Sequence, residues 1–253
     1  MIKNIILLKN LYYFFLKVNS AFSYSFLRSQ CYFHIILKTY ILNIIYNLQH
    51  KFEPKKGNLH LDQNEINYIY DEIEKLVPRI SNKYFKFINL EHIPSFAKKI
   101  VQRHKNDIEL FLGKNFVFEK MTFTLTKHIP NEFEHFDFYS NAWHTDSDSH
   151  KILKIFILIE EVTDKDGPFI YLSDKKTTEN WRFLRDRFIN SIVKVEGENH
   201  FTGKRGDYFI IDTSKNLHRA SNPAKDRKLL TLTLYPKWSQ TSDVARFEWN
   251  SIS

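Results

Sequence analysis

The stretch KILKIFILIEEV, residues 151–162, is a nearly continuous run of apolar residues that is rich in isoleucine. A run of this kind, bounded by charged residues, predicts a β-strand. Three more stretches are short and β-branched or aromatic, or alternate between apolar and polar residues: FEKMTFTLTK (118–127), GDYFIIDT (206–213) and KLLTLTLYP (228–236). From Phe116 onward, we therefore expect the chain to be built mainly from strands.

A helical pattern precedes these strands. Asp62 is predicted to cap a helix, because Glu65 completes a capping box and Leu61 and Ile66 have the spacing of a hydrophobic staple. Apolar residues then recur at helical spacing until Pro78, which ends the pattern.

Two further helices are predicted, one that ends before Gly113 and one over residues 177–192. Helices followed by strands indicate an α+β protein with a mainly β core, built as a sandwich or a barrel. We expect a single domain over residues 53–253. Its helical part is expected at residues 60–115 and its β core at about residues 116–238.

Residues 1–52 form a basic, apolar extension without any acidic residue. No uncharged run in it reaches the ~20 residues that a membrane-spanning helix needs, and Lys9 and Lys17 interrupt the apolar core of a signal peptide. Three interpretations stay open: peripheral contact with a membrane surface, packing against the following domain, or upstream sequence from a misassigned start. The segment EPKKGN, residues 53–58, has the composition of a linker.

The formal charge of +8 is concentrated in this extension, which holds six of the 37 basic residues and none of the 29 acidic residues. The rest of the chain is close to neutral and has no basic stripe for a phosphate backbone, so nucleic-acid binding is not expected. Cys31 is the only cysteine, which excludes an internal disulfide and a multi-cysteine zinc site. We expect a cytoplasmic protein, with membrane association through residues 1–52 as the open alternative.

A candidate metal site begins at His144 and Asp146, in the segment NAWHTDSDSH. At the end of a strand, residues two positions apart point to the same side, so this imidazole and this carboxylate could converge on one ion. His218, which follows a strand ending near Asp212, is the candidate third ligand. Two histidines and one carboxylate on one face of a metal match the facial triad of non-haem Fe(II) oxygenases. Zinc is the competing metal.

The same pattern, His-x-Asp, also occurs nine residues earlier, at His135 and Asp137. The residues alone leave both pairs open as ligands. Asp148 and His150 are expected to form hydrogen bonds in the loop or to face water.

From about Met121 to Pro236, the chain resembles the phytanoyl-CoA dioxygenase-like group of Fe(II)/2-oxoglutarate oxygenases. Four motifs carry the resemblance, in order: WHTDSD, LKIFILIEEVTDKDGPFIYL, GKRGDYFIIDTSKNLHRASNP and DRKLLTLTLYP. They match the group's His-x-Asp motif, its strand with acidic turn and Gly-Pro-Phe segment, its Gly-Asp turn with the distal His-Arg pair, and its closing strand. The resemblance implies a double-stranded β-helix (a jelly roll, cupin-like) with N-terminal helices packed against it.

The resemblance also implies the metal ligands. His144, Asp146 and His218 would bind Fe(II), since this His-x-Asp pair is followed at the group's distance by the long apolar strand and the Gly-Pro-Phe segment. The pair at His135 and Asp137 would need an extra loop to reach the same strand.

Arg227, nine residues after His218, would bind the distal carboxylate of the cosubstrate 2-oxoglutarate. A guanidinium offers a rigid fork that fits a carboxylate through two hydrogen bonds. Strand alternation that turns Arg227 inward turns Lys228 outward, and it gives Lys154 the parity to help hold the cosubstrate. Because the spacing from His218 to Arg227 is short for the group, Arg205 is the alternative.

The implied activity is hydroxylation of a small organic substrate by O2 and 2-oxoglutarate, with release of succinate and CO2. Asp146 leaves no vacancy for a halide, so hydroxylation is favoured over halogenation. The segment LSDKK, residues 172–176, departs from the group's pattern where the substrate mouth is shaped, so the substrate is not identified. Two alternatives remain: a peptide or protein hydroxylase of the same jelly-roll class, and a non-catalytic jelly-roll binding module.

Overall fold

Strand β6 (Leu153–Leu158) lies inside an antiparallel sheet, between β9 (Asp207–Asp212) and β11 (Arg227–Tyr235). These three strands coincide with three of the four predicted stretches, which confirms those predictions. In the computed structural model of the chain, the described residues are 51–133, 138–146, 149, 151–173, 195–237 and 246–249.

Strand β6 is apolar at consecutive positions because both of its faces are covered. Leu153, Ile155 and Ile157 belong to the core beneath the helices, whereas Phe156 and Leu158 belong to a second cluster on the other face. Successive side chains of a strand point to opposite faces, so a strand packed on both sides shows no polar alternation.

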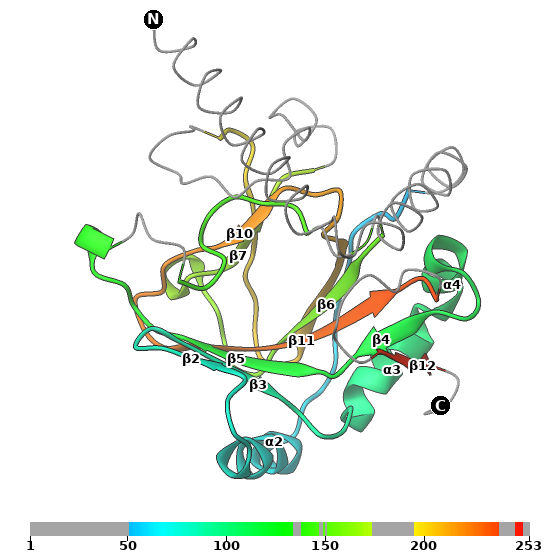
Figure 1. Cartoon of the computed structure of the whole chain (residues 1–253), viewed down its shortest axis with the longest axis horizontal. Coiled ribbons are helices and arrows are strands. Elements are labelled where there is room, and N and C mark those ends of the chain that lie inside the picture. Colours follow the sequence, from blue (N-terminus) through cyan, green and yellow to red (C-terminus); the bar gives the residue numbers. More distant parts are fainter. Residues whose placement is uncertain are drawn as a thin grey trace, which may run out of the picture. The chain divides into compact units, whose positions relative to one another are not determined.

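The described strands form two sheets in which all neighbouring strands are antiparallel. The larger sheet has the order β1-β9-β6-β11-β5-β3-β2, with β4 paired to β11 and β12 paired to β4; the smaller has the order β10-β7-β8. In Figure 1, β7 and β10 lie on the opposite side of β6 and β11 from helix α2. The remaining strands are β1 (Lys55–Asn58), β2 (Ile80–Ser81), β3 (Phe85–Asn89), β4 (Val117–Glu119), β5 (Thr122–Thr126), β7 (Phe169–Tyr171), β8 (Asn199–Phe201), β10 (His218–Ala220) and β12 (Arg246–Glu248).

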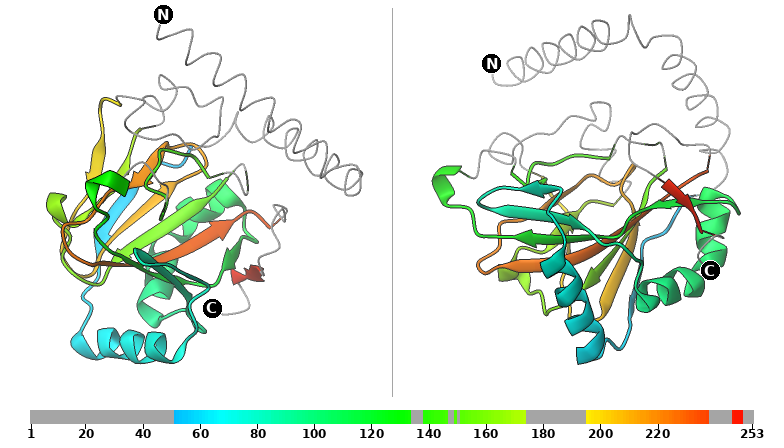
Figure 2. Two further views of the ribbon diagram at one scale, coloured as in Figure 1. Left: turned by 60° about the vertical axis from the view of Figure 1, so that its left-hand side comes forward. Right: turned by 60° about the horizontal axis from the view of Figure 1, so that its bottom comes forward.

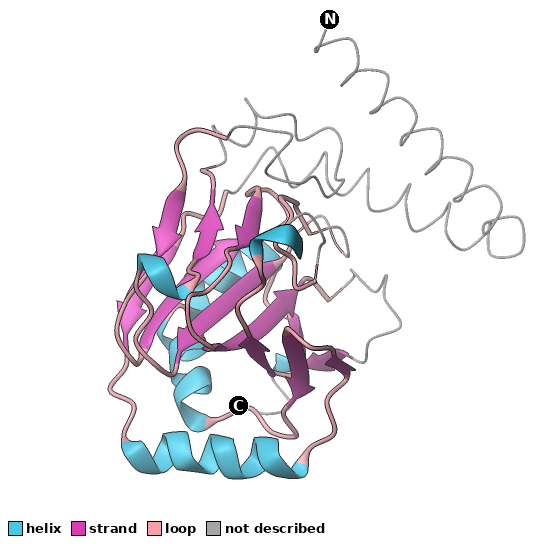
Figure 3. Ribbon diagram, turned by 90° about the vertical axis from the view of Figure 1, so that its left-hand side faces the viewer, coloured by secondary structure: helices cyan, strands magenta, loops and turns pink. Residues whose placement is uncertain are grey.

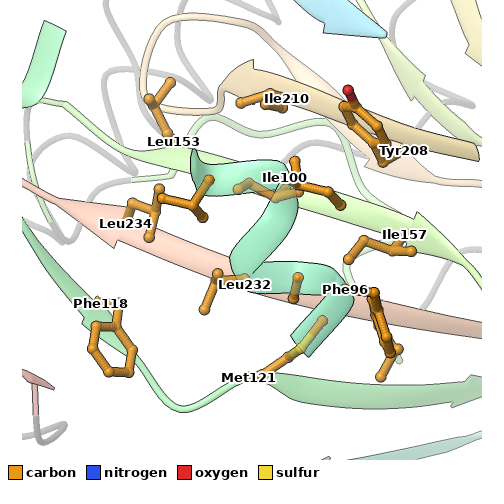
Figure 4. Close-up of a cluster of buried hydrophobic side chains, with 14 of the residues drawn as sticks. Phe96, Ile100, Phe118, Met121, Leu153, Ile157, Tyr208, Ile210, Leu232 and Leu234 are labelled. Carbon is orange, nitrogen blue, oxygen red and sulfur yellow. The ribbon is translucent and has the colours of Figure 1, made fainter. Parts of the chain in front are cut away.

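Helices cover the outer face of the larger sheet, as the views in Figures 2 and 3 show. Phe96 and Ile100 pack against Leu232 and Leu234 of β11 (Figure 4), and these side chains are almost completely buried. No described helix is long and apolar enough to cross a membrane. The helices are α2 (Gln63–Lys75), α3 (Ser95–Arg103) and α4 (Lys105–Leu112), and the short 3-10 helices are η1 (Asn131–Phe133) and η2 (Asp164–Asp166).

The face of the larger sheet that is turned away from the helices meets the smaller sheet. Phe156 of β6 and Phe169 of β7 lie with their ring centroids 4.4 Å apart, and Phe209 of β9 lies 6.2 Å from Phe169. We call the space between the two sheets the interior. Strand residues whose parity matches Phe156, Phe209 or Leu229 point into it.

The linker prediction for residues 53–58 is wrong, because Lys55–Asn58 form edge strand β1, paired with β9. The composition has a structural reason. The ring of Tyr208 lies against Gly57 so closely that a side chain at this position would collide with it. Gly57 is thus required by packing inside a strand. Phe52, which directly precedes the segment 53–58, is also buried, and its ring centroid lies 5.6 Å from that of Phe111.

The helical prediction for residues 60–115 is only partly correct. The predicted second helix is two helices, α3 and α4, which meet at His104. The imidazole of His104 contacts the hydroxyl of Tyr208 at 2.9 Å, so the break brings a polar side chain to a partner on the sheet. Strands β2 and β3 also lie in this range and pair with each other. Residues 1–50 and the predicted helix over 177–192 lie outside the described residues.

The first helix begins as predicted. Asp62 accepts a hydrogen bond from the Glu65 backbone N–H at 2.8 Å, and the Asp62 N–H donates to the Glu65 carboxylate at 3.3 Å. Asp62→Ala should therefore lower the free energy of unfolding by about 1 kcal/mol, measured by urea denaturation. Asp71→Ala, which removes an exposed carboxylate from the middle of the same helix, is the matched control. Equal losses in the two variants would contradict a capping role.

Candidate metal centre

His144 and His218 are held side by side by their own backbones. Each donates its N–H to the carbonyl of the other, at 3.0 Å and 2.9 Å, in an isolated antiparallel bridge. Their ring centroids are 4.3 Å apart, and both side chains are buried. His218 lies opposite Tyr171 in the register of β10 and β7, which places its imidazole on the interior side of the smaller sheet.

Asp146 completes the cluster. Its Oδ1 lies 3.7 Å from the Nε2 atoms of both His144 and His218. The three ligand atoms lie within 4.8 Å of one another, and among the described residues this is the only such group of three or more His, Cys, Asp or Glu. The structure thus brings together the three side chains that the sequence singled out, from positions 72 residues apart in the chain.

Each imidazole is oriented by a backbone carbonyl two residues earlier. His144 Nδ1 contacts the Ala142 carbonyl oxygen at 2.8 Å, and His218 Nδ1 contacts that of Asn216 at 2.9 Å. A carbonyl only accepts, so each Nδ1 carries the proton and each Nε2 offers a lone pair toward Asp146. Burial, with a smaller contribution from His144, lowers the pKa of His218 to about 3, so its ring is neutral at pH 7.

The Asp146 carboxylate is ionised in this buried position. Burial by itself would raise its pKa, but the positive charge of Lys154 holds the pKa well below the usual range for an aspartate. The ammonium of Lys154 lies 2.7 Å from Oδ2. Two imidazoles and one carboxylate, with their donor atoms converging, fit a divalent metal of the Fe(II) or Zn(II) kind.

A hydrogen-bonded turn holds the backbone of Asp146 in place. Its N–H donates to the Thr213 carbonyl oxygen at 2.9 Å. The turn that carries Thr213 is fixed by Asp212, whose carboxylate accepts from the Ser214 N–H at 3.0 Å and from the Ser214 hydroxyl at 2.7 Å. The end of β9 therefore positions a metal-ligand candidate from another segment.

Asp212 predicts a pH dependence of stability. Burial raises its pKa to about 6, against the opposing effect of the Ser214 hydrogen bonds. Between about pH 4 and pH 6 the folded protein keeps this proton while the unfolded chain has released it, so stability falls by roughly 2–3 kcal/mol as pH rises through this window. Asp212→Asn, which keeps an acceptor for Ser214, should remove that slope in urea denaturation at pH 4 to 7. An unchanged slope in the variant would contradict the raised pKa.

Arg227, at the start of β11, is buried and points into the interior. Its guanidinium donates to the Gly167 carbonyl oxygen and, at 3.2 Å, to the Thr126 hydroxyl, while its Nε has no hydrogen-bond partner. Burial lowers its pKa to about 10, which leaves it charged at pH 7. A buried cation with an unsatisfied donor suits an anionic ligand, and a carboxylate is the group that a guanidinium fork fits best.

The neighbouring cations lie elsewhere. Lys228 points to the opposite face, as the alternation predicts, and contacts Glu160 at 2.7 Å and Tyr70 at 3.3 Å. The guanidinium of Arg205 donates to the Ile159 carbonyl oxygen and to Gln63 of α2. Arg227 is therefore the one of the two proposed arginines that points into the interior with an unsatisfied donor.

Four candidate residues lie in segments that the structure does not describe, and some contacts of the metal cluster have no signal in the sequence. His135, Asp137, Asp148 and His150 lie outside the described residues. The contacts of the two histidines with the carbonyls of Ala142 and Asn216 are local, but a backbone carbonyl leaves no mark in the sequence. The contact of Lys154 with Asp146 has no sequence signal, because it depends on how β6 lies against the loop that holds Asp146.

No known protein family matches the sequence, and no curated protein matches it either. The structure resembles that of HygX from Streptomyces hygroscopicus, solved with nickel, 2-oxoglutarate and hygromycin B bound, with a TM-score of 0.50 and 14% identity over 77% of this chain and 86% of that chain. It also resembles EctD from S. alaskensis in its apo form, with a TM-score of 0.50 and 12% identity over 76% and 75% of the two chains. At such identities the likeness shows the fold, a mainly antiparallel jelly roll with few helices. The predicted fold class is confirmed.

Proposed function

We propose that the protein is an Fe(II)- and 2-oxoglutarate-dependent dioxygenase that hydroxylates a small organic substrate. The observation that carries the proposal is the convergence of His144 Nε2, His218 Nε2 and Asp146 Oδ1 in a buried cluster. Three protein ligands on one face leave the opposite positions of an octahedral metal open. The motif resemblance to phytanoyl-CoA dioxygenase-like oxygenases and the jelly-roll fold agree with this assignment.

The residues of the chain would have separate roles in binding the metal and the cosubstrate. When bound, iron and 2-oxoglutarate supply the oxidising chemistry, with succinate and CO2 as products. His144, Asp146 and His218 would hold the metal, and the guanidinium of Arg227 would bind the distal carboxylate of 2-oxoglutarate. For Lys154, which forms an ion pair with Asp146, we keep the prediction that it lies near the cosubstrate.

Phe156, Phe169 and Leu229 belong to the apolar cluster of the interior, into which Arg227 also points. They are buried and apolar, so they would exclude water from the site.

A small organic substrate is favoured over a peptide by one comparison. HygX, which shares the fold, was solved with the small molecule hygromycin B bound. Because Asp146 supplies a carboxylate to the metal cluster, no position is free for a halide, and hydroxylation is proposed over halogenation. The motif departure at residues 172–176 keeps the substrate itself unassigned.

The test is succinate formation by the full chain supplied with Fe(II), 2-oxoglutarate and O2. A slow release of succinate without substrate is expected, and it should depend on both iron and oxygen. Acceleration by members of a small-molecule panel, with no acceleration by peptides, is the expected result. Acceleration by peptides alone would favour a protein hydroxylase. Binding of iron and 2-oxoglutarate without any turnover would favour a binding module.

A further inference from the structure

The ion pair between Lys154 and Asp146 is placed unusually for a protein salt bridge. Lys154 lies on β6, an internal strand of the larger sheet, between Ile211 of β9 and Thr233 of β11. Its parity with Phe156 turns it into the interior, and its ammonium lies 2.7 Å from Asp146 Oδ2. The carboxylate is only 12% exposed and the lysine side chain 24% exposed. A charge in this apolar space needs a partner of opposite sign.

The two histidines and Asp146 differ in how their side chains are held. Each imidazole contacts a carbonyl two residues earlier in its own segment. Asp146 lies in a loop outside the strands, and its carboxylate is held by a side chain of the sheet. A lysine on a paired strand therefore fixes a ligand on a loop.

We propose that Lys154 is a positioning residue that confines Asp146 to one coordination position. The lysine engages Oδ2 at 2.7 Å, while Oδ1 lies 3.7 Å from both Nε2 atoms, so one oxygen of the carboxylate faces the metal cluster and the other does not. A carboxylate whose second oxygen is engaged in this way binds a metal through one atom. The remaining positions then stay open for cosubstrate and O2. This inference rests on the proposed function, because it requires that the cluster binds a metal.

Lys154 and Arg227 start from backbone positions far apart along the sheet, and the Lys154 ammonium is engaged by Asp146. Lys154 pairs with Thr233, whereas Arg227 is six positions earlier on the same strand, about 20 Å along it. The lysine therefore belongs to the metal end of the interior and the arginine to the other end. Contact of Lys154 with a cosubstrate would be limited to the groups nearest the metal.

The experiment measures Ni(II) binding by calorimetry to the metal-stripped full chain. Lys154→Met removes the charge and with it the ion pair at nearly constant length, and its Kd should rise by at least about tenfold, the usual cost of losing a partner of a metal ligand. Lys154→Arg keeps a cationic donor and should recover most of the affinity. A merely structural ion pair would not show this rescue in Ni(II) affinity. Loss of less than tenfold in Lys154→Met, or no recovery in Lys154→Arg, overturns the proposal.

Two further measurements keep the result unambiguous. Thermal unfolding of the metal-free variants shows whether they fold. If Lys154→Met does not fold, Lys154→Gln, which keeps a shorter neutral donor, takes its place. His144→Ala separates this inference from the proposed function. If His144→Ala binds Ni(II) like the wild type, the ligand assignment on which the proposed function rests is wrong. If His144→Ala loses binding while Lys154→Met keeps it, only the positioning role fails.

Discussion

His144→Ala is expected to abolish stoichiometric Fe(II) and Ni(II) binding and to lower succinate release by at least about 100-fold. Loss of an outer partner of a ligand costs about 10–100-fold, and loss of the ligand itself should exceed that. Removal of the imidazole leaves a buried gap beside His218 and Asp146. No other described His, Cys, Asp or Glu lies in the cluster to replace this ligand. Calorimetry with Ni(II) and a succinate assay with Fe(II) measure the two effects.

The matched control is His92→Ala. His92 is exposed and lies before α3, so its loss removes an imidazole without touching the cluster. Metal binding and succinate release should both stay at the wild-type level. If His144→Ala still binds one metal ion per chain, the ligand assignment is wrong, and the pair at His135 and Asp137 becomes the next candidate.

Arg227→Lys is expected to raise the KM for 2-oxoglutarate by roughly 30- to 150-fold while leaving Ni(II) affinity close to that of the wild type. The lysine keeps the charge but cannot reproduce a two-pronged hydrogen bond to a carboxylate, a loss of about 2–3 kcal/mol. The geometry supports the split between the two readouts, because Arg227 contacts Gly167 and Thr126 and none of the metal-ligand candidates. Succinate release at varied 2-oxoglutarate concentrations measures the KM.

Arg205→Met tests the alternative directly. The guanidinium of Arg205 is engaged by Ile159 and Gln63, so its loss should leave the KM for 2-oxoglutarate unchanged. A large rise in KM for Arg205→Met, with none for Arg227→Lys, would transfer the carboxylate-binding role to Arg205.

Local sequence patterns were sufficient to predict several structural features of this protein. The capping box at Asp62 and Glu65 is closed by residues three positions apart, so no tertiary contact is needed to define it. Strands β6, β9 and β11 were recognisable because buried strands leave short runs rich in apolar, β-branched or aromatic residues. The two-residue period of a strand placed Arg227 and Lys228 on opposite faces.

Tertiary structure decided everything that depends on a partner from elsewhere in the chain. Residues 53–58 have the composition of a linker, yet Gly57 is where the ring of Tyr208 packs, and the segment becomes strand β1. The break between α3 and α4 at His104 likewise meets Tyr208. In both cases the deciding contact comes from about 100 residues or more away, and no local pattern records it.

The metal cluster shows the same division. The sequence by itself supplied His144, Asp146 and His218 as residue types with the right chemistry, and their motif order made them candidates. Only the fold could bring His218 against His144 through a backbone bridge and set Lys154 against Asp146. The direction of a side chain follows from the local geometry of its strand and can be predicted from the sequence. Which strands pair depends on the free energy of packing the whole sheet, which no local pattern records.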